Sequence, residues 1–346
     1  MSPFTVVLIV PTGIGAAIGG YAGDALPVAR AIAQISDRLI THPNVLNGAQ
    51  LYWPLDNTYY VEGYGLDRFA AQDWGLRPVR QNKIGLLLDS AIEPELRLRH
   101  LQAADATRAT LGLDLTDYVI TDAPLEVELR TADSGASWGT IGNPGSLLRA
   151  AEKLIKLGGA EAIAVVARFP DDTSESLQNY RHGSGVDHIA GAEAVISHLI
   201  VRQFQIPAAH APALLPLAID PEVSPRAAAE ELGYTFLPCV LVGLSRAPQF
   251  VTTPSNSPDI IWSDAVDMVV VPYSSCGGSA ILSLANQAEI IAVTNNTTKI
   301  QVTPEPLGIK ITKVNSYLEA LGAIAARRAG IDFRVLNPAI SNLQSL

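Results

Sequence analysis

Cys276 lies in a run of small residues, SSCGGS at 274–279, that begins where an apolar segment ends. We expect a helix to follow this run, and the positive end of a helix dipole lowers the pKa of a nearby thiol. The pattern predicts an accessible thiolate that acts as a nucleophile or removes a proton, with Ser275, Gly277 and Gly278 holding the ligand. The alternative is a small buried residue, the common role of a free cysteine.

Histidines form a second set of candidates for acid–base chemistry. His42 ends a predicted strand in the sequence THPN, and four other histidines lie between residues 182 and 210. Because imidazole titrates near neutral pH, we expect His42, His188 and His210 to act as catalytic groups with Cys276. The alternative is that these histidines are ordinary structural residues.

The same histidine-rich region is where a metal ion would find ligands. Asp187 and Glu193 lie between its histidines, and a metal site needs several such groups to converge. However, His188, Glu193 and His198 do not recur at a spacing of four, so one helix face cannot present all three. A bound metal is possible but disfavoured, and we assign no metal ligand.

A glycine-rich turn follows the first predicted strand. Glycines let backbone N–H groups approach an anion at a helix start, although tight strand–helix packing would also require small residues. A dinucleotide fingerprint would need Gly or Ala where Ile18 stands, and no Walker lysine follows. NAD and ATP are therefore disfavoured as cofactors, and the cofactor stays unknown. The residues of the turn expected to hold a ligand are Thr12, Gly13, Gly15, Gly19 and Gly20.

Three further polar residues complete the predicted ligand site. Arg80, with the basic residues on either side of it, would clamp an anionic group beside the first glycine turn. Asn295 and Asn296 follow a predicted strand and would hydrogen-bond a polar ligand. The alternatives are a solvated basic segment and an Asx-type turn.

Buried strands and helices alternate along nearly the whole chain. Continuous apolar runs rich in β-branched residues are typical of parallel strands that are buried on both faces. We therefore predict an α/β fold with mostly parallel sheets, built from Rossmann-like βαβ units with Gly-rich strand-to-helix turns. The expected strands are residues 5–10, 38–41, 84–89, 118–121, 161–167, 236–243 and 267–271. The expected helices are residues 26–35, 93–111, 146–157, 190–203 and 316–328.

The length of 346 residues favours two lobes. We place an N-terminal α/β lobe at residues 1–130 and a C-terminal α/β lobe at residues 131–346, the second beginning in a small-residue loop at 131–145. Residues 45–82 have no clean period and are expected to form an irregular excursion, either a lid or an interface. The segments from Val10 and Val271 resemble each other, which suggests two similar βαβ units with a cleft between their strand ends.

Composition narrows the partners and the cellular setting. A formal net charge of −10 disfavours nucleic acid and anionic membranes, which need a basic surface. The hydrophobic fraction of 48% against 17% charged residues predicts buried strands or a homo-oligomer interface. Of the two cysteines, Cys239 is assigned to packing, and so low a count favours a reducing compartment. The uncharged stretch 4–23 lacks the basic start of a signal peptide, and Pro11 and its glycines argue against a membrane span.

Several stretches resemble an uncharacterised family with a domain of unknown function, known mainly from cyanobacteria and plastids. They are PTGIGAAIGGYAGDALP, THPNVLNGA, YVEGYGLDRFA, GVDHIAGAEAVISH and YSSCGGSA. The resemblance extends from Val6 to about Ile331 and implies a cytoplasmic or plastid-stroma setting. It brings no known activity and no catalytic residue.

The leading hypothesis is an enzyme that acts on a small anionic metabolite in a cleft between the two glycine turns. The loop at 180–188, together with His210, is expected to complete the site. Isomerisation, racemisation or group transfer fits best, although a two-cysteine racemase is disfavoured because the first turn has no cysteine. One alternative is a glycosyltransferase-like protein that binds a nucleotide sugar at the turn around Cys276. The other is a non-catalytic metabolite-binding or assembly protein.

Overall fold

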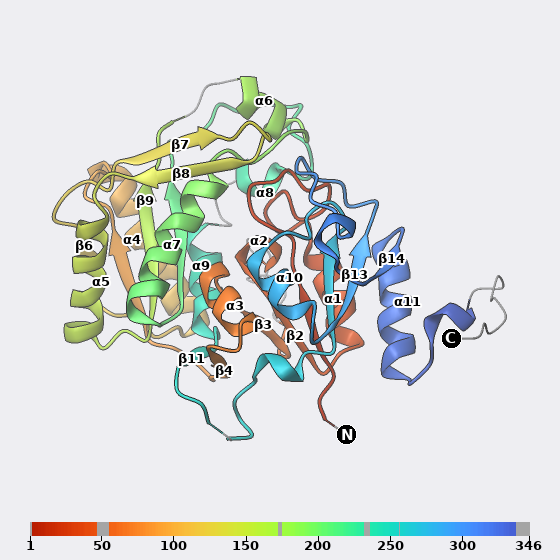
Figure 1. Cartoon of the computed structure of the whole chain (residues 1–346). Coiled ribbons are helices and arrows are strands. Elements are labelled where there is room, and N and C mark those ends of the chain that lie inside the picture. Colours follow the sequence, from red (N-terminus) through yellow and green to blue (C-terminus); the bar gives the residue numbers. More distant parts are fainter. Residues whose placement is uncertain (1, 47–54, 172–174, 232–235, 256, 337–346) are drawn as a thin grey trace.

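The computed structural model describes residues 2–46, 55–171, 175–231, 236–255 and 257–336, and contains two parallel sheets (Figure 1). The larger sheet has the strand order β14-β13-β12-β1-β2-β3, and each neighbouring pair is parallel. Its strands are β1 (Thr5–Leu8), β2 (Arg38–Thr41), β3 (Thr58–Tyr60), β12 (Met268–Pro272), β13 (Glu289–Val293) and β14 (Ile311–Val314).

The second sheet has the order β10-β9-β5-β6 and is also parallel. Two small antiparallel pairs, β4 with β11 and β7 with β8, lie outside the two sheets. The strands of the second sheet are β5 (Ile84–Leu88), β6 (Val119–Ile120), β9 (Ala162–Arg168) and β10 (Ala208–Ala213). The strands of the antiparallel pairs are β4 (Gly75–Arg77), β7 (Val127–Thr131), β8 (Ser137–Ile141) and β11 (Gln249–Val251).

Helices connect and cover these strands (Figure 1). Within the described residues, no helix combines the length and the apolar character that crossing a membrane requires. The helices are α1 (Leu26–Gln34), α2 (Pro43–Leu46), α3 (Gly63–Ala70), α4 (Pro94–Leu111), α5 (Pro144–Gly158), α6 (Glu175–Arg181), α7 (Ala190–Phe204), α8 (Ala228–Glu231), α9 (Leu237–Ser245), α10 (Ser279–Leu284) and α11 (Tyr317–Arg328).

The continuous apolar runs form the central strands, as predicted. All residues of β1 and β12 are buried, and β9 is buried except for Arg168 at its end. A parallel strand is covered on both faces by crossover helices, so its side chains are apolar in both directions. One apolar cluster includes Val6 of the larger sheet and Ile84 of the second. The α/β fold with mostly parallel sheets is confirmed.

The sheets do not follow the division at residue 130, which falls within β7. β1 pairs with β12, and β5 pairs with β9, so each sheet takes strands from both sides of that position. The two similar segments are indeed βαβ units, β1–α1–β2 and β12–α10–β13, and they are neighbours in one sheet. The first and last parts of the chain therefore build one sheet, and the middle builds the other.

Three local predictions differ from the structure. Residues 236–243 were expected to be a strand but form most of α9, which packs against α4, β9 and β10 and is buried on all sides. A uniformly apolar run has no period that separates a buried helix from a buried strand. The expected loop at 131–145 contains β8 of the β7–β8 hairpin. The excursion at 45–82 contains β3, α3 and β4, and its residues 47–54 lie outside the described residues.

The loop after β1 is joined to the loop after β13 through Asn296. The side chain of Asn296 accepts a hydrogen bond from the Ile18 N–H at 2.8 Å and donates to the Ile18 carbonyl at 2.9 Å. The same amide group lies 2.7 Å from the hydroxyl of Tyr317 at the start of α11. Asn296 is fully buried, so these contacts replace water completely. They fix the glycine-rich loop against the larger sheet.

We expect Asn296→Ala to lower the free energy of unfolding by about 3 kcal/mol, because it leaves buried backbone and hydroxyl groups without partners. Asn295→Ala is the matched control, since Asn295 is exposed, and it should change stability by less than about 0.5 kcal/mol. Urea unfolding followed by circular dichroism measures both. Equal stability of the two variants would contradict this role for Asn296.

Candidate functional site

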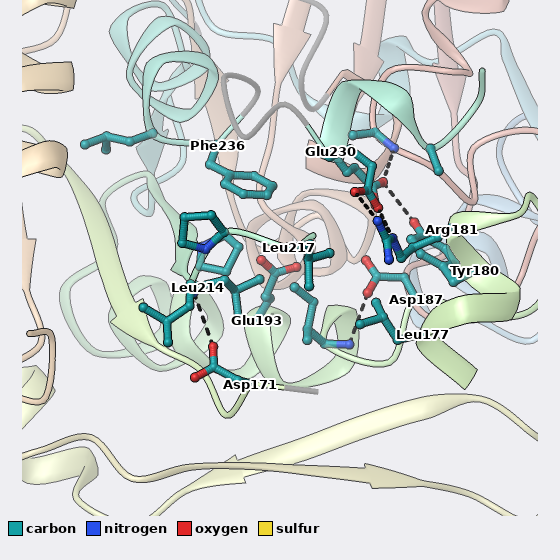
Figure 2. A pocket seen from close by; sticks show the side chains of 18 of the residues that line it. Asp171, Leu177, Tyr180, Arg181, Asp187, Glu193, Leu214, Leu217, Glu230 and Phe236 are labelled. Carbon is teal, nitrogen blue, oxygen red and sulfur yellow. Dashed lines mark hydrogen bonds and ion pairs between the residues drawn. The ribbon is translucent and has the colours of Figure 1, made fainter. Parts of the chain in front are cut away.

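A cavity of about 690 Å³ lies at the carboxyl ends of β9 and β10 (Figure 2). Pro170 and Asp171 follow β9 into its wall, and residues 212–218 contribute the segment that begins at the end of β10. Parallel α/β sheets commonly bind ligands at this edge. Apolar side chains form much of the wall, among them Leu214, Leu217 and Phe236.

Five carboxyl groups line this cavity. Asp171 and Glu231 form ion pairs with arginines, and the other three are Asp187, Glu193 and Glu230. Asp187 precedes α7 and accepts a hydrogen bond from the Ile189 N–H at 3.1 Å, so it helps to start that helix. Glu193 lies in the first turn of α7 and is buried. Glu230 belongs to α8 and accepts from the Ala22 N–H at 2.6 Å. Two parts of the chain, the start of α7 and the helix α8, therefore bring these carboxyl groups together.

Burial raises the pKa of all three groups because it disfavours a charged carboxylate. The pKa of Glu230 is raised to about 8 by burial and by the nearby charge of Asp187. Burial, together with the charges of Asp187 and Glu230, holds the pKa of Glu193 well above its usual range. Burial also raises the pKa of Asp187, against backbone N–H groups that favour its charged form. At neutral pH Glu230 is therefore mostly protonated, and burial likewise favours the neutral form of Glu193.

Tyr180 supports Glu230 and connects the cavity to the glycine-rich loop. Its hydroxyl lies 2.9 Å from Oε1 of Glu230 and 2.9 Å from the Gly20 carbonyl oxygen. Its ring stacks on that of Tyr21, with the ring centres 4.5 Å apart. The neighbouring Arg181 is buried and paired with Glu231 at 2.7 Å. The acidic wall is thus held in place by buried contacts on both sides.

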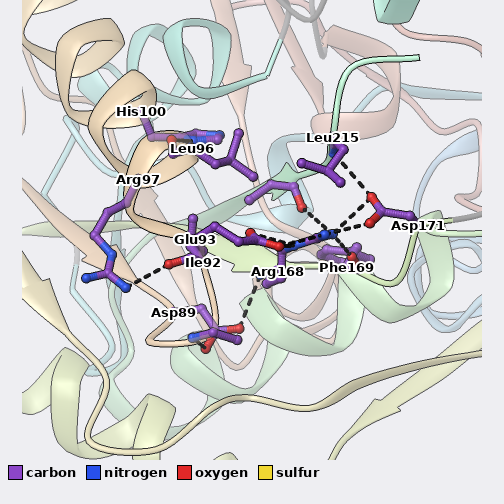
Figure 3. Close-up of polar contacts among 12 residues, drawn as sticks. Asp89, Ile92, Glu93, Leu96, Arg97, His100, Arg168, Phe169, Asp171 and Leu215 are labelled. Carbon is purple, nitrogen blue, oxygen red and sulfur yellow. Dashed lines mark hydrogen bonds and ion pairs between the residues drawn. The ribbon is translucent and has the colours of Figure 1, made fainter. Parts of the chain in front are cut away.

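Arg168 joins the segments that follow β5, β9 and β10 (Figure 3). Its guanidinium forms ion pairs with Glu93 at 3.0 Å and with Asp171 at 2.6 Å. Asp171 in turn accepts a hydrogen bond from the Leu215 N–H at 3.2 Å. Asp89 is fully buried and accepts from the Arg168 backbone N–H. This network positions the segment at 212–218 over the cavity.

Two of the four predicted catalytic groups lie at or beside the cavity. His188 lines it, and Nε2 of His210 is 3.8 Å from Oε2 of Glu193. His42 directly follows β2, and its Nε2 accepts a hydrogen bond from the Val10 N–H, just beyond the end of β1, at 3.1 Å. Burial lowers the pKa of His42 to about 4, so the ring is neutral. Its contact with Val10 supports a structural role for His42.

Cys276 does not have the environment that the sequence predicted. The residue is fully buried, and its Sγ lies 3.5 Å from the Tyr273 carbonyl oxygen. Burial raises the pKa of the thiol to about 11, and the charge of Glu305 adds to this. The expectation of an accessible thiolate with a lowered pKa is therefore wrong. The six-residue α10 starts only at Ser279, and Cys276 instead packs within an apolar cluster.

The first glycine turn is bonded to other parts of the chain. The Ala17 N–H donates to the Thr297 carbonyl at 2.8 Å, and the Gly13 carbonyl accepts from the Ser137 N–H at 2.9 Å. Within the loop, the Gly19 N–H donates to Asp24 at 2.6 Å. Gly13 has φ +71, and a Cβ there would lie 2.5 Å from the Ser137 hydroxyl oxygen, so close packing requires this glycine. Of this loop, Ala22 is among the described residues that line the cavity. The following predicted ligand residues are not in that lining: Thr12, Gly13, Gly15, Gly19 and Gly20.

The second predicted set also lies outside the described lining of the cavity. The Ser275 hydroxyl donates to the Pro272 carbonyl, and a Cβ on Gly277 would lie 2.6 Å from a methyl group of Val302. Gly278 precedes α10, Arg80 and Asn295 are exposed, and Asn296 has the buried role described above. The described residues contain no group of three or more His, Cys, Asp or Glu side chains placed to hold a metal ion.

Sequence reasoning missed Glu230 as a site residue, whereas it expected the loop at 180–188, which begins with Tyr180 and Arg181, to belong to the site. For Glu193 a signal exists, because it is the one carboxylate in the apolar stretch AGAEAVISHLIV. Burying a lone carboxylate on a helix costs folding free energy unless the group has a partner, so its presence indicates a partner or a function. Glu230 lies in the ordinary helical sequence AAAEEL, where nothing distinguishes it.

A family model for proteins of unknown function, DUF3326, matches residues 5–337. The chain belongs to this family. The predicted resemblance to an uncharacterised cyanobacterial family is confirmed. An uncharacterized lipoprotein of Synechococcus sp. (strain ATCC 27144 / PCC 6301 / SAUG 1402/1) is 61% identical over 344 residues, which cover 99% of this chain and 96% of that protein. No solved structure matches the chain.

The burial of both cysteines generates a prediction about their reactivity. We expect neither Cys239 nor Cys276 to react measurably with a thiol reagent in the folded protein, because both are buried. Both should react at once in urea. Absorbance of the released thiolate of Ellman's reagent measures this. If one thiol of the folded wild type reacted rapidly and Cys276→Ala lost that reaction, Cys276 would be accessible and our assignment of it as a buried thiol would be wrong.

The raised pKa of Glu230 predicts how stability depends on pH. The folded protein keeps this proton up to a pKa of about 8, whereas the unfolded chain releases it near 4.5. Stability therefore falls as the pH rises from about 5 to about 8. Glu230→Gln imitates the neutral carboxyl group and cannot release a proton. In this variant the decrease in the free energy of unfolding between about pH 5 and about pH 8 should be smaller by on the order of 3 kcal/mol. Urea unfolding across this range measures it.

The control for this experiment is Glu222→Gln, which changes an exposed carboxyl group. It should keep the wild-type dependence of stability on pH. If Glu230→Gln also keeps that dependence, the proton does not reside on Glu230.

Proposed function

We propose that the protein is an enzyme that moves protons on a small organic molecule, in the manner of an isomerase or racemase. One observation carries the proposal: Asp187, Glu193 and Glu230 line the same largely apolar cavity at the carboxyl edge of a parallel sheet. General acid–base catalysis needs groups whose pKa lies near the working pH. Carboxyl groups reach that range when burial raises their pKa.

The arrangement supplies proton-transfer groups on different parts of the wall. Glu230, with Tyr180 beside it, comes from α8 and α6. Glu193 comes from α7 and has the neutral ring of His210 behind it. A ligand between them would meet Glu230 as a proton donor on one side. On the other side it would meet Glu193, whose unprotonated oxygen can accept a proton when its own proton moves to His210. An isomerase or racemase needs this pair of roles.

The wall favours a ligand that is neutral or cationic at the group facing the carboxyls. The arginines that line the cavity are already paired, Arg181 with Glu231 and Arg99 with Glu95. An anionic group would approach Asp187, Glu193 and Glu230 without a free described cation among the lining arginines. We therefore replace the anionic metabolite expected from the sequence with a neutral or cationic one that also has an apolar part.

Group transfer and non-catalytic metabolite binding remain the alternative functions. A nucleotide sugar is less well supported, because the turn around Cys276 lies outside the described lining of the cavity. The cytoplasmic or stromal setting and a homo-oligomer stay predictions from the sequence. The name of the Synechococcus relative makes association with a membrane the alternative setting.

The test is a screen of small neutral and cationic metabolites with the full-length chain in D₂O. Mass spectrometry would detect a compound that exchanges a C–H proton for deuterium. We expect exchange with the wild type and a loss of about 100-fold or more in Glu193→Gln and in Glu230→Gln. The exposed control, Glu222→Gln, should exchange at the wild-type rate.

Two outcomes would contradict the proposal. A compound that binds tightly in the cavity but never exchanges would favour a non-catalytic binding protein. Exchange that survives in Glu193→Gln and in Glu230→Gln would place the chemistry elsewhere in the chain.

A further inference from the structure

A line of buried polar side chains leads from the cavity into the protein behind α7. Glu193 and Ser197 are one turn apart on α7, and His210 of β10 lies against both. Oε2 of Glu193 is 3.8 Å from Nε2 of His210, and Nδ1 of His210 is 3.2 Å from the Ser197 hydroxyl oxygen. That hydroxyl is 3.5 Å from Oε1 of Glu62, which is 2.9 Å from Nε2 of His198.

Glu62 is the acceptor at the far end of this line. Oε2 of Glu62 accepts the N–H groups of Tyr64 and Gly65, at 2.8 and 3.2 Å, and so caps α3. Oε1 faces Ser197 and His198. Burial disfavours a charged His198, but the hydrogen bond and charge of Glu62 outweigh this, and the pKa of His198 is raised. Two backbone N–H groups and Nε2 of His198 thus surround Glu62, and donors of this kind pair with a carboxylate.

The donors and acceptors give the line a direction. The Ser197 hydroxyl has two pure acceptors in reach, Glu62 at 3.5 Å and the Ala194 carbonyl at 3.3 Å. Its proton therefore points to one of them, and its oxygen is left to accept from Nδ1–H of His210. His210 is neutral, because burial and the charge of His198 lower its pKa to about 3. Nε2 of His210 then has no proton and can only accept one, from Glu193.

We propose that this line of side chains forms a proton relay that carries a proton from a ligand in the cavity to Glu62, with Glu193 as the group that touches the ligand. The ligand gives its proton to Oε1 of Glu193, and the proton on Oε2 passes to Nε2 of His210. The Nδ1 proton of His210 passes to the Ser197 oxygen, and the Ser197 proton passes to Glu62. One proton leaves the ligand and one arrives at Glu62, and each group between them is neutral before and after.

This proton relay deepens the proposed function and rests on it. It names Glu193 as the base and His210, Ser197 and Glu62 as positioning residues. It also gives the removed proton a route to the protein surface. His198 bonds to Glu62 and has a side chain that is 42% exposed. Contacts in such chains commonly shorten when a ligand is bound, so the 3.8 Å between Glu193 and His210 is compatible with this transfer.

The experiment measures which nitrogen of His210 carries the proton, and it needs no ligand. The full chain is labelled with ¹⁵N-histidine, and His210 is assigned by the signal lost in His210→Gln. We expect a neutral ring with the proton on Nδ1 at neutral pH. Ser197→Ala removes the acceptor of that proton and should shift the ring towards the Nε2–H form.

The matched control is Ser245→Ala, which also removes a buried helical hydroxyl, one that donates to the Val242 carbonyl. It should leave the His210 signals unchanged. Three results would each overturn the proposed proton relay. They are a wild-type His210 ring with its proton on Nε2, an imidazolium at neutral pH, and unchanged His210 signals in Ser197→Ala.

The two proposals fail separately. If His210 has the expected tautomer but no compound exchanges deuterium, the proposed function fails, whereas the donor-to-acceptor direction of the proton relay is retained. If exchange occurs but His210 has the opposite tautomer, the enzyme stands and Glu193 passes its proton by another route.

Discussion

The free-energy cost of burying a carboxylate governs the wall of the cavity. Asp187, Glu193 and Glu230 are brought from different elements into one largely apolar space. Three negative charges there would lose their hydration and repel one another, so the pKa of each group is raised and its protonated form is favoured. The Ala22 N–H and the Tyr180 hydroxyl favour the charged form of Glu230, but burial outweighs them. A neutral His210 lies behind Glu193. The reactivity that we propose is a consequence of this desolvation.

Buried polar groups also need partners within the protein, which explains why the glycine-rich loop differs from an anion site. Its backbone meets acceptors and donors from the protein itself, with Asn296 on one side and Glu230 on the other. Arg226 adds an ion pair to Asp24 and lies over the ring of Tyr21, 4.4 Å from its centre. The loop therefore acts as a joint between the larger sheet and the cavity wall. Its glycines serve close packing there.

The family to which the chain belongs has no described function, so the argument for one rests on the chemistry of the cavity. The high identity of the Synechococcus relative over nearly its whole length makes that protein suitable for the same experiments. The cavity and the line behind α7 are connected through Glu193, which belongs to both. This shared residue makes α7 the element on which the chemistry would depend.

The sequence by itself predicted the parallel α/β class, because short apolar runs rich in β-branched residues, such as those that form β1 and β12, are typical of strands covered on both faces. It also identified the family and drew attention to the region that contains His188 and His210. Only the tertiary structure decided that residues 236–243 form a helix and that Cys276 is sealed from solvent. Local sequence carries periodicity and propensity, whereas desolvation and encounters such as that of Glu230 with Asp187 depend on which distant segments pack together.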